Sequence, residues 1–152
     1  MKNKTCCFTG QGALPDGQGR FILELLKKEL ISLIESGITY FYTGGEFGFD
    51  MMAARAVLKL RREYKQIELI VVLPCEDRAR VHELSYIKIL QDADKVIYTP
   101  KRCFPGRVSE RDRYLVNYSA VCICYLERAS GSTAYTVNYA KKKGLTIKNL
   151  AE

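Results

Sequence analysis

The segment Thr43-Gly44-Gly45-Glu46-Phe47-Gly48-Phe49-Asp50 carries residues that are well suited to bind an anion. An aromatic and β-branched run precedes it at 38–42, and a helical pattern follows from Met51 to Tyr64. A strand that ends in glycines and continues as a helix leaves backbone N–H groups unpaired at the helix N-terminus, where they and the helix dipole favour a phosphate. Asp50 is expected to cap this helix. The alternative is a tight turn that needs small residues and binds nothing.

Two other turns show a similar combination. The turn Thr9-Gly10-Gln11-Gly12 begins like a dinucleotide fingerprint, but Pro15 occupies the place of the third glycine, so NAD is not predicted. Thr9, Gly10 and Gln11 remain candidates for contact with phosphate or ribose, and the alternative is a flexible loop. In the turn Gly131-Ser132-Thr133, amides and hydroxyls at a helix start could hold a phosphate. The alternative there is that Ser132 or Thr133 only caps the helix.

The segment 107–114 adds positive charge at another strand end. Arg111 and Arg113 lie two residues apart, so on a helix they do not share a face. One of them could enter the cleft and bind a phosphate through its guanidinium, while the other packs or pairs with Asp112 or Glu110. The alternative is a surface cluster of salt bridges.

Carboxylates follow the apolar run 68–73. Pro74, a candidate ligand contact, precedes Glu76 and Asp77. These two carboxylates could orient a sugar hydroxyl or serve as acid and base, although a role in capping the next helix is the favoured interpretation. Together with Glu46 they form a weak set of catalytic candidates.

Strand and helix patterns alternate along the whole chain and position these turns. Strands are expected at 5–9, 39–43, 68–73, 95–98, 121–126 and 145–148, and helices at 21–35, 50–64, 81–91, 110–119 and 132–143. This order predicts one α/β domain over residues 1–152, with a single parallel sheet of about six strands and helices on both faces. The apolar runs 68–73 and 121–126 are expected inside the sheet. Because ligands bind outside the C-terminal ends of such strands, the turns are expected to converge on one cleft.

The composition is that of a globular protein, with 152 residues, 47% apolar and 27% charged residues and a net charge of +7. No apolar run is long enough to span a membrane, and no signal peptide precedes the first strand, so a cytoplasmic protein without a membrane partner is expected. The positive charge is compatible with nucleotides or nucleic acid. Four of the six cysteines, Cys6, Cys7, Cys122 and Cys124, are expected to be buried free thiols, and no metal is predicted.

Four segments together resemble the SLOG superfamily, namely Cys6–Gly10, Gly44–Asp50, Glu110–Asn117 and Gly131–Ala140. This Rossmann-like group includes the cytokinin-activating LOG proteins and the DNA-processing protein DprA, and the chain looks most like its small YpsA-like branch. The resemblance implies a Rossmann-like fold, a nucleotide-type ligand and self-association as a homo-oligomer.

The sequence departs from these relatives in two places. The YpsA-like branch usually has a His-Arg-Pro run after the first glycine, whereas Gln11-Gly12-Ala13 stands here. LOG-like hydrolases have an acid on the helix where Asn138 stands in this chain. An amide cannot act as a carboxylate base or stabilise a cationic sugar by its charge, so binding is favoured over catalysis.

Three functions are therefore considered, in order of preference. The first is a binding module or sensor for a nucleotide or nucleotide-derived molecule, with no further cofactor predicted. The second is a LOG-like nucleoside-monophosphate phosphoribohydrolase. The third is a DprA-like binder of single-stranded nucleic acid that uses the segment 111–113. Most of the 16 aromatic residues fall in expected strands and helix faces, so the sequence shows no evident stacking platform.

Overall fold

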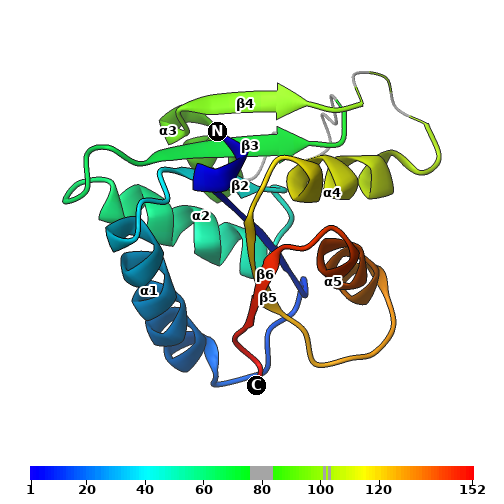
Figure 1. The fold of residues 1–152 in the computed structure, drawn as a ribbon, viewed down its shortest axis with the longest axis horizontal. Coiled ribbons are helices and arrows are strands. Elements are labelled where there is room, and N and C mark those ends of the chain that lie inside the picture. Colours follow the sequence, from blue (N-terminus) through cyan, green and yellow to red (C-terminus); the bar gives the residue numbers. More distant parts are fainter. Residues whose placement is uncertain (76–83, 101, 103) are drawn as a thin grey trace.

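Six parallel strands form one sheet in the computed structural model, which describes residues 1–75, 84–100, 102 and 104–152 (Figure 1). The strands are β1 (Thr5–Gly10), β2 (Tyr40–Thr43), β3 (Glu68–Leu73), β4 (Lys95–Tyr98), β5 (Val121–Tyr125) and β6 (Thr146–Asn149). Their order across the sheet is β4-β3-β2-β1-β5-β6, and every neighbouring pair is parallel. The predicted α/β class, with its parallel sheet, is confirmed.

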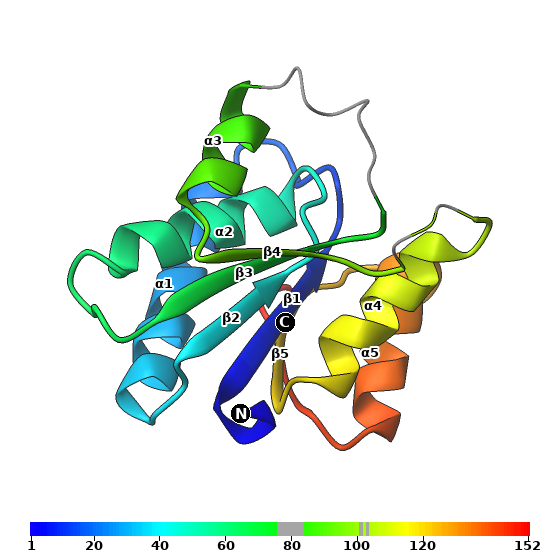
Figure 2. The ribbon, with the colours of Figure 1, turned by 90° about the horizontal axis from the view of Figure 1, so that it is seen from above.

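Helices cover both faces of this sheet (Figure 2). The helices α1 (Gly19–Glu35), α2 (Phe49–Leu60) and α3 (Leu84–Asp92) lie on one face, and α4 (Arg107–Asn117) and α5 (Ser132–Lys142) lie on the other. A short 3₁₀ helix, Lys2–Lys4, precedes β1. A parallel pair of strands needs a crossover, and each helix supplies one.

The two faces carry two hydrophobic cores because side chains alternate along each strand. On β1, Cys6 and Phe8 pack with residues of α1 and α2, whereas Cys7 points to the opposite face and packs with Leu115 of α4 and Val137 of α5. This double coverage explains why β3 and β5 read as nearly continuous apolar runs.

The predicted interior position of β3 and β5 is confirmed, since β4 and β6 are the edge strands. The strand boundaries agree with the sequence prediction to within about one residue. The fourth helix begins at Arg107, three residues earlier than expected, because Gly106 takes a left-handed conformation, φ +93°, and starts the helix there. Glu76, Asp77 and the expected start of the third helix lie outside the described residues.

The four cysteines of β1 and β5 are buried free thiols, as predicted. Cys7 and Cys122 stand opposite each other in the pairing of β1 with β5. Cys75, which follows β3, is buried and disulfide-bonded. In the described ranges, no helix has both the length and the apolar character that crossing a membrane requires.

Candidate functional site

Three strand-to-helix turns meet around a cavity of about 680 Å³ at the C-terminal edge of the sheet. The strand order accounts for this, because β1 lies between β2 and β5 and the turns after these three strands are therefore neighbours. The cavity is lined by Thr9, Gly10, Gln11 and Gly12 of the first turn, Glu46, Phe47 and Asp50 of the second, and Gly131, Ser132 and Thr133 of the third. Arg111 and Asp112 of α4 and Arg128 also line the cavity. We call Arg111, Asp112, Glu46 and Asp50 the floor of the cavity, and Arg128 with the third turn its wall.

Glycines let the first two turns pack closely. Gly48 has φ +84°, and a Cβ at this position would collide with the carbonyl oxygen of Gly12. A Cβ on Gly10 would lie 2.5 Å from the ring of Phe49. The amide of Phe49 donates to the carbonyl oxygen of Gln11 at 3.2 Å. The two turns are thus joined through the backbone, and larger side chains would separate them.

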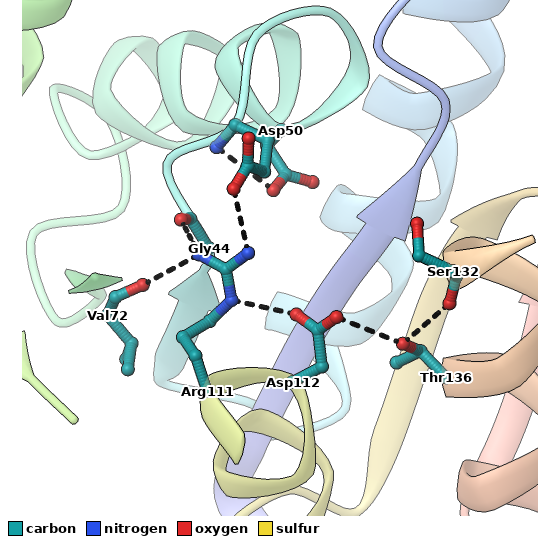
Figure 3. Close-up of polar contacts among 8 residues, drawn as sticks. Gly44, Asp50, Val72, Arg111, Asp112, Ser132 and Thr136 are labelled. Carbon is teal, nitrogen blue, oxygen red and sulfur yellow. Dashed lines mark hydrogen bonds and ion pairs between the residues drawn. The ribbon is translucent and has the colours of Figure 1, made fainter. Parts of the chain in front are cut away.

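Arg111 belongs to this floor and is almost fully buried. Its polar contacts are drawn in Figure 3. Its Nη2 donates to Glu46 Oε1 at 2.9 Å, and its Nε donates to Asp112 Oδ1 at 2.7 Å. Nη1 donates to the carbonyl oxygen of Gly44 and, at 3.4 Å, to that of Val72. The guanidinium therefore ties α4 to the ends of β2 and β3, and its charge is already shared by two carboxylates.

Asp50 lies beside this guanidinium, 5% exposed, and its position corrects the sequence prediction. The residue that caps α2 is Gly48, which uses no side-chain hydrogen bond, and Asp50 falls inside the first helical turn. Its Oδ2 accepts a hydrogen bond from the amide of Glu46 at 3.3 Å. Its Oδ1 is buried and has no hydrogen-bond partner among the described residues.

Burial raises the pKa of Asp50 from its ordinary value of 3.8 to about 7, although the nearby Arg111 and the amide of Glu46 lower it. Burial also raises the pKa of Asp112, against the opposing effect of Arg111. A carboxyl with a pKa near neutrality can exchange a proton with a ligand under ordinary conditions. Three acidic side chains thus surround a single buried arginine.

Asp112 also connects the floor to the third turn. The Thr136 hydroxyl lies 3.3 Å from Asp112 Oδ2 and 3.0 Å from the carbonyl oxygen of Ser132, and it can donate its single proton to only one of them at a time (Figure 3). Through this hydroxyl, α4 is placed against the first turn of α5. The cap of α5 is Gly131, with no side-chain hydrogen bond, so neither Ser132 nor Thr133 acts as the N-cap.

Of the predicted ligand contacts, nine line the cavity: Thr9, Gly10, Gln11, Glu46, Asp50, Arg111, Gly131, Ser132 and Thr133. The other seven do not: Thr43, Gly44, Gly45, Gly48, Phe49, Pro74 and Arg113. These seven shape the turns or lie elsewhere. A Cβ on Gly44, for example, would lie 3.0 Å from both Arg111 Cζ and Asp50 Oδ2, and the Arg113 guanidinium lies 3.3 Å from the Tyr135 hydroxyl.

The other nine lining residues are not among the predicted ligand contacts: Phe8, Gly12, Ala13, Phe47, Val108, Asp112, Leu126, Arg128 and Ser130. The sequence predicts Asp112 only as a partner for an arginine. Arg128 stands three residues after the end of the buried strand β5, and a cation so close to a strand end is a usable signal. Asn138, the supposed site of a lost acid, is exposed on α5 and does not line the cavity. The acids of this site come from the second turn and from α4.

The donor set suits an organic ligand better than a metal ion. Among the described residues, no cluster of three or more histidine, cysteine, aspartate or glutamate side chains is placed to hold a metal. The carboxylates of the floor can accept hydrogen bonds from hydroxyls. The free amides at the start of α5 and the Arg128 side chain can hold an anionic group.

An all-parallel sheet with a cleft at the C-terminal ends of its strands defines a Rossmann-like α/β protein. The YpsA family model, described as the YspA SLOG family, matches residues 15–149, and the chain belongs to this family. A UPF0398 protein of Halalkalibacterium halodurans is 32% identical over 130 residues, which cover 81% of this chain and 69% of the relative. A UPF0398 protein of Brevibacillus brevis is 28% identical over 129 residues, covering 80% and 69%.

Two solved structures of DNA processing protein A share the fold. The protein from Helicobacter pylori, described with a single-stranded DNA binding mode, superposes with a TM-score of 0.67 at 16% identity. The protein from Streptococcus pneumoniae superposes with a TM-score of 0.69 at 13% identity. Each match covers 96% of this chain but only 64% and 50% of the respective structure. At such identities the likeness concerns the fold alone.

Proposed function

We propose that the cavity binds a nucleotide-derived small molecule with both ribose hydroxyls and phosphate, and that the protein serves as a binding module or sensor for it. The observation that carries this proposal is the buried carboxyl of Asp50, which lines the cavity while its Oδ1 lacks a partner among the described residues. A buried polar atom without a hydrogen bond is costly, so a ligand O–H or N–H that reached it would contribute strongly to binding.

The wall of the cavity could hold an anionic group. The first amides of a helix have no partner within the helix, and in α5 these belong to Ser132 and the residues that follow. Arg128 adds a positive charge that makes no ion pair with any other described residue. Hydroxyl acceptors at the floor and an anion site at the wall match the two ends of a nucleotide.

The floor also argues against a bare phosphate as the ligand. Glu46, Asp50 and Asp112 face one guanidinium, so the floor has an excess of negative charge once Asp50 ionises. A free phosphate would be repelled there, whereas a neutral sugar would be accepted. The ligand should therefore present its hydroxyls to Asp50 and keep its charge near α5.

Isothermal titration calorimetry with ADP-ribose, AMP, adenosine and inorganic phosphate tests this proposal. We expect ADP-ribose or AMP to bind, with adenosine and phosphate each at least tenfold weaker because each offers only one half of the recognition. Asp50→Ala should lower the affinity for ADP-ribose by about 10- to 100-fold, which corresponds to the loss of one hydrogen bond to a charged group. Asp16→Ala, in an exposed loop that does not line the cavity, is the control.

Failure of all four compounds to bind would reject the proposal, as would equal binding of phosphate and ADP-ribose. Displacement of ADP-ribose by a single-stranded oligonucleotide would assign the cavity to nucleic acid instead.

A hydrolase is the second candidate, and the pKa of Asp50 favours it. A buried carboxyl with a pKa of about 7 could donate a proton to a leaving base at neutral pH. It ranks second because Glu46 and Asp112, which would have to stabilise a cationic sugar, are both already hydrogen-bonded to the guanidinium of Arg111. Chromatography of AMP after incubation with the protein tests it, and release of adenine that Asp50→Asn abolishes would place catalysis first.

A further inference from the structure

A second cavity, of about 590 Å³, lies between α2 and α3 and shares no lining residue with the first. Five of its lining side chains are cationic: Arg55, Lys59, Arg61, Arg62 and Lys88. Asp92 is its one acidic lining residue among those the structure describes. We call this feature the basic groove.

Most of this positive charge is not neutralised within the protein. Arg61 Nη1 forms an ion pair with Asp94 Oδ2 at 2.7 Å, so its charge is shared. Arg55, Lys59, Arg62 and Lys88 make no ion pair in the described part of the chain. All four are exposed, so their charges are available to a partner.

The cations are arranged on both sides of the groove. Arg55, Lys59 and Arg62 follow one another at four- and three-residue spacing, which puts them on the same side of α2 and of the turn that continues it. At a rise of about 1.5 Å per residue, they are separated by roughly 6 Å and 4.5 Å along the axis. Lys88 of α3 faces them across the groove.

We propose that the basic groove binds the sugar-phosphate backbone of single-stranded nucleic acid without reading its sequence. A row of cations a few ångströms apart complements a chain of regularly spaced phosphates, which supply most of the affinity in sequence-independent binding. The groove has no aromatic lining residue among the described ones, so base stacking has no platform there. A flexible single strand can follow a concave path between two helices.

The composition of the groove disfavours other anionic partners. A flat membrane surface does not enter a concave groove. The apolar lining residues of the groove are Leu58, which is half-buried, and Ile89, which is buried, so neither is fully exposed for insertion. The segment 111–113 is a poorer candidate for the same role, because Arg111 is buried and already paired with Glu46 and Asp112.

Fluorescence anisotropy with labelled oligo-dT and oligo-U of 20 nucleotides tests the proposal, with a poly-glutamate competitor as the acidic-protein arm. The triple variant Arg55→Gln, Lys59→Gln, Arg62→Gln should bind at least tenfold more weakly than the parent. The slope of log K against log salt concentration should also be shallower by about 2 for this variant than for the parent, since each lost phosphate contact removes roughly 0.7 from the slope.

The chain offers a control with the same change in net charge. Lys141→Gln, Lys142→Gln, Lys143→Gln removes three exposed cations at the end of α5, away from the groove. Lys88→Gln, on the other helix, is a second variant that should weaken binding independently. Circular dichroism checks that all variants remain folded.

The proposal would be overturned by no binding by the parent at 50 mM salt, by an equal loss of affinity in the control triple variant, or by displacement of the oligonucleotide by poly-glutamate at equal charge concentration. The comparison of oligo-dT with oligo-U shows whether DNA or RNA is preferred. A labelled 20-bp duplex that bound as well as the single strands would contradict the assignment to single-stranded nucleic acid.

Discussion

Arg111 is the residue on which the geometry of the cleft depends. Its side chain joins α4 to Glu46 of the second turn and to the carbonyl oxygens at the ends of β2 and β3. An arginine whose three side-chain nitrogens all donate to groups inside the protein positions the site more than it binds a ligand. The hypothesis that Arg111 contributes a free charge to phosphate binding is therefore less attractive than a role for Arg128.

Replacing Arg111 by methionine should destabilise the protein by about 3 kcal/mol or more, because Asp112 would keep a buried charge without its partner. Arg113→Met is the matched control. Arg113 lies two residues away and is half-buried, and its guanidinium donates a hydrogen bond to the Tyr135 hydroxyl and forms no ion pair with another described residue, so a loss below about 1 kcal/mol is expected. Urea unfolding of the two variants measures the difference. Similar losses of unfolding free energy in both variants would show that the ion pairs of Arg111 contribute little to stability.

Asp50 gives the protein a pH-dependent stability of defined sign. Its pKa is about 7 in the folded protein against an ordinary value of 3.8, so between these values the unfolded chain loses its proton first. The free energy of unfolding should therefore fall as the pH rises from about 4 to about 7 and level off above that. Arg111, Glu46 and Asp112 are the charged groups that face it.

Asp50→Asn removes this dependence. Relative to the variant, the parent should lose about 4 kcal/mol of stability between pH 4 and pH 8, at 1.36 kcal/mol per pKa unit. Urea unfolding of both proteins at four or five pH values measures it. A difference between parent and variant that stays constant with pH would contradict a raised pKa at this position.

The same carboxyl should make ligand binding depend on pH. If ribose hydroxyls donate to ionised Asp50, the affinity for ADP-ribose should be about tenfold lower at pH 6 than at pH 8, following the ionised fraction of a group with a pKa of about 7. ADP-ribose is the appropriate probe because its pyrophosphate does not titrate in this range. Asp50→Asn should abolish the dependence in calorimetry. Stronger binding at the lower pH would mean that protonated Asp50 is the donor.

At the scale of elements, the strand-to-helix turns were the part of the site that the sequence predicted well. A buried strand followed by glycine and a helix is a local pattern, so Gly10, Gly48 and Gly131 could be recognised without a structure. The capping role of Asp50 was wrong because Gly48, at φ +84°, ends the turn two residues earlier. The local residue types could not show that the helix begins directly after Gly48 and not at Asp50.

The turn before α5 offers a clean test of anion binding. Gly131 lines the cavity, and Gly144 follows the other end of the same helix; both have positive φ, +102° and +84°, and a Cβ at either would touch nothing within 4 Å. Alanine at either position should cost about 1–3 kcal/mol of stability through backbone strain. Only Gly131→Ala should also lower the affinity for ADP-ribose, because it would displace the backbone amides at the start of α5.

Thermal unfolding and calorimetry of these two variants separate strain from binding. Gly45 is less suitable, although its φ is +73°, because a Cβ there would lie 2.6 Å from Leu73 and disturb the core. Equal ADP-ribose affinity in Gly131→Ala and Gly144→Ala would remove the α5 turn from the site.

At the scale of the whole molecule, the fold was predictable and the electrostatic pattern was not. Apolar runs and their alternation with helical patterns identify a parallel sheet, and the strand order then brings the turns together. The pairing of Arg111 with Glu46, 65 residues apart, depends on tertiary contacts that no local pattern encodes. A net charge of +7 likewise does not show that acids gather at the cleft while free cations gather at the basic groove.

Helix α2 links these two regions, since Asp50 in its first turn lines the cleft and Arg55 and Lys59 further along line the basic groove. A coupling between the sites would require a movement that both ligands favour differently. The helix packs one face into the core through Ala53 and Val57, which leaves it little freedom to move as a unit.

We therefore expect the two sites to be independent, with saturating ADP-ribose changing the affinity for oligo-dT less than twofold. Anisotropy titrations with and without ADP-ribose measure this, and the Arg55, Lys59, Arg62 triple glutamine variant should bind ADP-ribose as the parent does. A change of tenfold or more, about 1.4 kcal/mol, would instead show that α2 transmits ligand binding from the cleft to the groove.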